Sequence, residues 1–158
     1  MHWSLEGLDG EVLKTGQEAV SAVPLASTHV CMLDFSGCIS DENAREVIFI
    51  CELWQGDRRV TLSLATFVPN KHLLLTNPTL RTNVQQDGNK LVFKLTNESL
   101  ARFVELSLDG VDVVFSDNYF DLPAGRTVEV ISPLPEGWTV DQARKALRVR
   151  ALYDSFAL

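Results

Sequence analysis

Short runs of alternating apolar residues, separated by turn dipeptides, occupy most of the chain and constrain its fold more than any other feature. Asp9-Gly10, Asp87-Gly88 and Asp109-Gly110 each stand between two such runs, and Gln55-Gly56-Asp57 separates two more. Asp-Gly favours tight hairpin turns because these residues tolerate a positive φ. The sequence therefore predicts antiparallel hairpins and an all-β fold.

The apolar runs of the first 70 residues predict strands that do not complete a sandwich. We expect strands over residues 3–8, 11–13, 17–23, 28–35, 46–54 and 58–68. The run 46–54 is apolar on both faces, which is typical of a central strand covered on both sides. An immunoglobulin-like sandwich normally has about seven strands, and here the pattern starts at Trp3 with no strand before it. We therefore expect a sandwich that is incomplete on its N-terminal side.

A connector bracketed by prolines precedes a second set of strands. Pro69 and Pro78 enclose a leucine-rich stretch, and turn signals recur at short spacing after it. We expect strands over residues 80–85, 90–96, 102–108, 111–115, 119–122, 127–131 and 147–153. Their number and spacing match an immunoglobulin-like sandwich. The predicted organisation is a partial immunoglobulin-like β-sandwich (1–70), a connector (71–78) and a C-terminal immunoglobulin-like β-sandwich (79–158).

One short helix is predicted near the C-terminus. Thr139 and Gln142 have the spacing of a capping box, in which each side chain accepts a hydrogen bond from a backbone N–H at the start of the helix. Asp141 is favourable in the first turn, and Ala143 and Ala146 belong to a short apolar stripe.

Charge, length and cysteine content exclude several classes of protein. The 158 residues include 21 acidic and 14 basic side chains, a formal net charge of −7. This balance argues against a partner that is nucleic acid or an anionic membrane. A (β/α)₈ barrel needs about 250 residues, so the chain is too short to contain one. Cys31, Cys38 and Cys51 are odd in number and form no Cys-x-x-Cys pair, so we expect reduced thiols and a cytoplasmic location.

No residue pattern predicts a catalytic or metal site. The chain has no Gly-x-Ser-x-Gly nucleophile elbow and no glycine-rich phosphate loop. Its histidines and cysteines do not have the spacing of zinc ligands. We therefore predict no catalytic residue, no bound metal and no cofactor.

The densest acidic region, from Asp109 to Asp121, admits three interpretations. A calcium loop fails because the glycine and glutamate spacing of an EF-hand is missing. A glycosidase pair could use Asp117 and Asp121, but nothing in the sequence places two carboxyls at the required separation of about 5–9.5 Å. We favour the third interpretation, in which Asp109, Asp117 and Asn118 shape turns.

Aromatic side chains are the remaining candidates for ligand binding, because sugar-binding proteins use exposed rings as stacking platforms. Trp54, Tyr119 and Trp138 are the predicted sugar-stacking residues. Trp54 ends a core strand and Trp138 precedes the predicted helix, positions where an aromatic ring is more often a packing anchor. A glycosylation sequon, Asn97-Glu98-Ser99, has meaning only in a secreted eukaryotic protein.

Three segments of the second domain carry a family pattern. They are residues 100–110, 115–125 and 147–152, and the run Ser116-Asp-Asn-Tyr-Phe-Asp-Leu is the most specific element. These segments resemble the C-terminal immunoglobulin-like domain of β-mannosidases in glycoside hydrolase family two. Upstream, residues 8–13, 24–28 and 67–73 are similar to the sandwich domain that precedes it. Related exo-glucosaminidases share this architecture, so the resemblance leaves the sugar open.

The resemblance implies a non-catalytic C-terminal accessory region that braces the catalytic barrel of a β-mannosidase-like hydrolase. In that family the catalytic glutamates lie on the barrel, and no position of this sequence matches them. The implied partners are the remaining domains of the parent glycosidase, and unpaired strand edges in an incomplete sandwich predict self-association. Two alternatives stay open: a carbohydrate-binding module, and a free-standing β-sandwich that binds other proteins.

Overall fold

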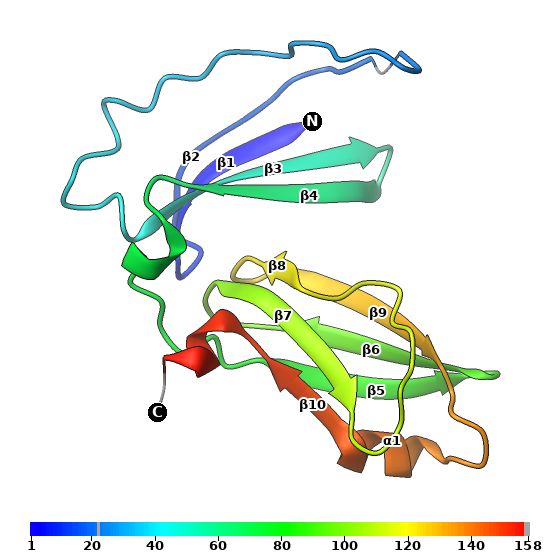
Figure 1. Ribbon diagram of the computed structural model, residues 1–158. Coiled ribbons are helices and arrows are strands. Elements are labelled where there is room, and N and C mark those ends of the chain that lie inside the picture. Colours follow the sequence, from blue (N-terminus) through cyan, green and yellow to red (C-terminus); the bar gives the residue numbers. More distant parts are fainter. Residues whose placement is uncertain (22, 157–158) are drawn as a thin grey trace. The chain divides into compact units, whose positions relative to one another are not determined.

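The computed structural model describes residues 1–21 and 23–156, and the chain divides into two compact units, Met1–Leu74 and Leu75–Leu158. Both units consist of antiparallel β-sheets, and one short α-helix lies in the described part of the second (Figure 1), so the predicted all-β class is confirmed. The predicted strand 17–23 and domain 79–158 include residues 22 and 157–158, which lie outside the described residues. Among the described residues, no helix combines the length and the hydropathy that a membrane span requires.

The first unit contains one four-stranded antiparallel sheet. Its order is β2 (Val12–Gln17), β1 (His2–Gly7), β3 (Val47–Gln55) and β4 (Arg58–Thr66). Hairpins join β1 to β2 and β3 to β4, and Gly10 and Gly56 supply the positive φ that these turns need, 89° and 57°. A short 3₁₀ turn, η1 (Asn70–His72), follows β4.

Side chains cover the inner strands of this sheet on both faces. Ile48 and Ile50 of β3 are almost fully buried. On the opposite face, the ring of Phe35 lies 5.9 Å from that of Trp3 and 5.5 Å from that of Phe49, between ring centroids. Phe35 comes from the long connection between β2 and β3, so this connection supplies part of the second layer over the sheet.

Two strands predicted in that connection are absent from the described residues. Within the described residues, 28–35 pair with no strand, and 18–21 contain no strand because β2 ends at Gln17. The alternation is nevertheless present: Phe35 is half-buried, whereas Met32 is 88% exposed. One side of the segment packs on the sheet while its backbone forms no ladder, so the pattern reflected packing and not strand pairing.

The second unit is a sandwich of two three-stranded sheets. One sheet has the order β5 (Arg81–Asp87), β6 (Lys90–Thr96) and β9 (Thr127–Pro133), and the other has the order β10 (Leu147–Arg150), β7 (Ala101–Leu108) and β8 (Phe120–Leu122). A 3₁₀ turn, η2 (Leu152–Ser155), follows β10.

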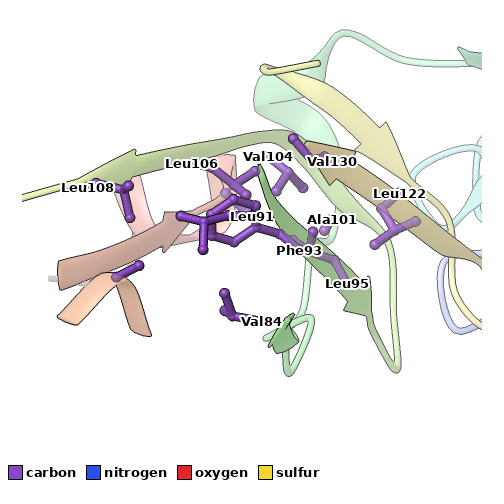
Figure 2. Close-up of a cluster of buried hydrophobic side chains, with 12 residues drawn as sticks. Val84, Leu91, Phe93, Leu95, Ala101, Val104, Leu106, Leu108, Leu122 and Val130 are labelled. Carbon is purple, nitrogen blue, oxygen red and sulfur yellow. The ribbon is translucent and has the colours of Figure 1, made fainter. Parts of the chain in front are cut away.

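The core of the sandwich lies between these sheets. Leu91, Phe93 and Leu95 alternate along β6, and Val104 and Leu106 alternate along β7; all five are nearly inaccessible to solvent. Figure 2 shows these side chains gathered from the two sheets into one cluster. Alternation along both strands places their apolar side chains in this shared core, as the period-two pattern predicts.

The prediction of a strand over residues 111–115 is wrong. Val111 forms only an isolated bridge to Leu108, and the segment then runs on as an extended connection. Val113 and Phe115 are partly buried against the core, which accounts for the alternating pattern. As in the first unit, contact on one side produces alternation without a paired backbone.

The α-helix of the second unit, α1 (Val140–Ala146), forms with the predicted capping box. The Gln142 N–H donates to Thr139 Oγ1 at 3.3 Å, and the Thr139 N–H donates to Gln142 Oε1 at 2.8 Å. The Arg144 guanidinium donates to the Val84 carbonyl oxygen at 2.7 and 3.1 Å, which fixes the helix to β5.

Candidate functional site

Two of the three predicted sugar-stacking residues are half-buried in packed positions. Trp54 lies near the end of β3, and its ring stacks on that of His2 with a centroid distance of 5.8 Å. Trp138 packs against the core of the second unit just before α1. Both tryptophans are less exposed than Tyr119, the third predicted residue.

Tyr119 is 64% exposed and lies in a hollow of about 350 Å³ on the second unit. We call this hollow the Tyr119 hollow. It is lined by Phe103, Glu105, Tyr119, Arg150, Ala151, Leu152, Asp154 and Ser155. Trp138 is not among these residues, so the structure does not bring the predicted aromatics of this unit together. Phe103, which is 39% exposed, is the second aromatic of the hollow and was not predicted from the sequence.

A backbone irregularity places Phe103 in the hollow. The register between β7 and β8 shifts between Ala101 and Val104, so β7 carries an extra residue there. Phe103 has φ of 52°, and Tyr119 has φ of 59°. Positive φ is strained for bulky residues, and bulges commonly redirect side chains near functional sites. Two strained aromatic residues therefore line one hollow.

The two carboxylates of the hollow already accept hydrogen bonds from neighbouring donors. The Tyr119 hydroxyl donates to Glu105 Oε1 at 3.1 Å, and this bond, with the charge of the carboxylate, raises the pKa of Tyr119 above its ordinary value. Asp154 accepts the Ala151 N–H at 2.7 Å. The Arg150 side chain is exposed and has no hydrogen-bond or ion-pair partner within residues 1–21 and 23–156.

Polar residues of the run 116–122 form hydrogen bonds with backbone groups of neighbouring strands. The side-chain amide of Asn118 accepts the Leu106 N–H at 2.7 Å and donates to the Leu106 carbonyl at 3.0 Å. Ser116 exchanges a similar pair of bonds with Ile131 of β9, at 2.7 and 2.9 Å. These residues hold the connection between the two sheets in place.

Asp121 supports the bulge of β7. Its Oδ1 accepts the Phe103 N–H at 3.1 Å and lies 2.9 Å from Arg102 Nε, and the Arg102 guanidinium packs over the Phe103 ring. Asp117 accepts the N–H of Asn118 at 2.9 Å, a local turn contact. The two aspartates considered as a glycosidase pair thus both bind nearby backbone N–H groups.

A second hollow of about 660 Å³ lies beside β9 and is more apolar, with Val114, Phe115 and Ile131 among its lining residues. In the described residues, no group of three or more histidine, cysteine, aspartate or glutamate side chains could hold a metal ion. Cys31, Cys38 and Cys51 are free thiols, and burial raises the pKa of Cys51.

The sequon asparagine is buried. Asn97 is 8% exposed, and its Nδ2 donates to the carbonyl oxygens of Ser99 and Leu122, at 2.5 and 2.7 Å. The atom that would carry a glycan is therefore occupied within the fold.

Comparison with known domain families agrees with this architecture. Residues 75–155, just over half of the chain, match the Ig_mannosidase family, described as an Ig-fold domain. The chain belongs to this mannosidase Ig-fold family. Residues 1–72 match a second family, Mannosidase_ig, described as a mannosidase Ig/CBM-like domain. The predicted resemblance to the immunoglobulin-like domains of mannosidases is confirmed.

A solved structure is similar to nearly the whole of these mannosidase Ig-like domains. The crystal structure of β-D-mannosidase from Dictyoglomus thermophilum matches with a TM-score of 0.77 and 17% sequence identity. The match covers 95% of this chain and 18% of the mannosidase chain. At this identity the likeness establishes the fold. No curated protein sequence matches the chain.

Proposed function

We propose that these mannosidase Ig-like domains form a non-catalytic accessory region of a β-mannosidase-like glycoside hydrolase and brace its catalytic barrel. The observation that carries the proposal is the pair of family matches, which together cover residues 1–72 and 75–155. The similar Dictyoglomus enzyme is a β-D-mannosidase of which this chain spans 18%. The remaining domains of the parent glycosidase are then the principal partner.

The chemistry of the second unit favours support over catalysis. Its densest acidic region commits Asp117 and Asp121 to backbone N–H groups, and Asn118 to both backbone groups of Leu106. Between its sheets lies a tightly buried core. A rigid unit of this kind can hold a neighbouring domain in position without contributing to bond cleavage.

We also propose that the first unit self-associates when it is isolated from the parent protein. Within the described residues, β2 and β4 each pair with a strand on one side only. Val60 on β4 and Val12 on β2 are 51% and 55% exposed. Unpaired edges with exposed apolar residues favour strand pairing between copies.

The bracing role can be tested on the whole protein encoded by the reading frame that contains this chain. We expect that frame to encode a catalytic barrel, and we would express the protein with and without residues 1–158. Deletion should shorten the half-life of activity at elevated temperature and leave kcat per folded molecule on an aryl β-mannoside unchanged. A frame without a barrel, or a deletion that lowers kcat while the half-life is kept, would overturn the proposal.

A further inference from the structure

We propose that the Tyr119 hollow binds a neutral pyranose sugar. The hollow combines two partly exposed aromatic rings, Phe103 and Tyr119, with charged groups that can hydrogen-bond to sugar hydroxyls. This inference is independent of the bracing role, since it concerns binding by the chain alone.

The aromatic part of the hollow suits the apolar face of a sugar ring. The C–H bonds on one side of a pyranose pack well on an aromatic ring, and tyrosine combines an apolar ring with a polar hydroxyl. Phe103 and Tyr119 are held in the hollow by left-handed backbone, at the bulge of β7 and just before β8. Strain of this kind persists where the surrounding structure fixes it, and it clusters at ligand sites.

The polar part of the hollow supplies both hydrogen-bond donors and acceptors. Glu105 is an acceptor that already holds the Tyr119 hydroxyl. Arg150 is a donor without a partner in the part of the chain that the structure describes. Sugar hydroxyls both donate and accept, so one hydroxyl can bridge a carboxylate and a guanidinium. Small-molecule pockets are mainly apolar with a few polar groups of this type.

The size and charge of the Tyr119 hollow limit the kinds of ligand that it can bind. The volume of about 350 Å³ lies near the lower end of the 300–1,000 Å³ range of small-molecule pockets, which suits a mono- or disaccharide. Glu105 and Asp154 oppose an anionic ligand, and Arg150 opposes a cationic one. A neutral sugar satisfies the hydrogen-bonding groups without either repulsion.

The test is an NMR titration of the ¹⁵N-labelled chain with β-1,4-mannobiose, cellobiose and N,N′-diacetylchitobiose, with glucuronic acid as an anionic probe. We expect at least one neutral sugar to shift the amide signals of residues lining the hollow, with a dissociation constant on the order of 1 mM. Tyr119→Ala should weaken binding about tenfold, and Arg150→Ala should weaken it as well, because an aromatic contact and a charged donor are removed. We expect that variant to retain the fold, since the Arg150 side chain is exposed and has no partner among the described residues.

Val114→Ala is the matched control, because Val114 is an 81% exposed apolar residue of the same unit that lies outside the Tyr119 hollow. It should bind like the unmodified chain. Three results would overturn the proposal: no shifts with any neutral sugar, shifts that map elsewhere on the chain, or binding of glucuronic acid alone.

Discussion

Asn118 acts as a substitute for a paired strand residue beside β7. Its side chain satisfies both the N–H and the carbonyl of Leu106, at 2.7 and 3.0 Å. We predict that Asn118→Ala lowers the free energy of unfolding by about 1–3 kcal/mol, because it removes the partners of two partly buried backbone groups. Urea unfolding monitored by circular dichroism measures this loss.

Asp112→Ala is the control for this prediction. Asp112 is exposed in the same connection, and surface substitutions of this kind change stability by less than about 0.5 kcal/mol. Equal stability of the Asn118 and Asp112 variants would contradict the role assigned to Asn118.

Gly16 leaves space for a tryptophan side chain beside β2, the edge strand of the first sheet. It pairs with Trp3 across β1 and β2, and a Cβ built on Gly16 would lie 2.6 Å from Trp3 Cε2. We predict that Gly16→Ala destabilises the chain by about 1–3 kcal/mol, since the buried indole must shift. Thermal unfolding checks this, with Gly37→Ala as control, because nothing lies within 4 Å of a Cβ there. If both alanines are tolerated equally, the packing argument is wrong.

At the scale of elements, the helix is held by its cap and by one arginine. We predict that Thr139→Ala destabilises the second unit by about 1 kcal/mol, because it removes the acceptor for the Gln142 N–H. Thr139→Ser should retain most of the stability, since its hydroxyl can accept the same bond. Urea midpoints of the two variants provide the comparison, and a serine variant as unstable as the alanine variant would count against the cap.

Elements that depend on local signals could be predicted from the sequence. The turns at Gly10, Gly56 and Gly88 form with positive φ, as the dipeptides indicated, and the capping box at Thr139 is confirmed. Residues 28–35 and 111–115 were mistaken for strands, because alternation reports one buried side and does not show whether the backbone has a partner.

In the Tyr119 hollow, too, the residue with a local sequence signal was predicted, and the residue placed by contacts between distant segments was not. Tyr119 was predicted as a ligand-stacking residue, and it is exposed. Phe103 was not predicted, because its place in the hollow depends on a bulge between β7 and β8 and on contacts from η2. A register shift between strands distant in sequence leaves no local signal, whereas the alternating pattern of β7 suggested an ordinary strand.

At the scale of the whole molecule, the sheet of the first unit governs the behaviour of the isolated chain. We predict that the average mass measured by light scattering rises with concentration above that of a 17.6 kDa monomer. Val60→Lys, which places a charge on the exposed β4 edge, should reduce this association because edge lysines oppose strand pairing. A constant monomer mass for the unmodified chain would contradict the prediction.

The central claim, that these mannosidase Ig-like domains support catalysis without performing it, is tested most directly by assaying the purified chain on 4-nitrophenyl β-D-mannoside. We predict no release of nitrophenol above the rate without protein at any chain concentration. Turnover that rises in proportion to the amount of purified chain, and that persists through further purification, would contradict the claim.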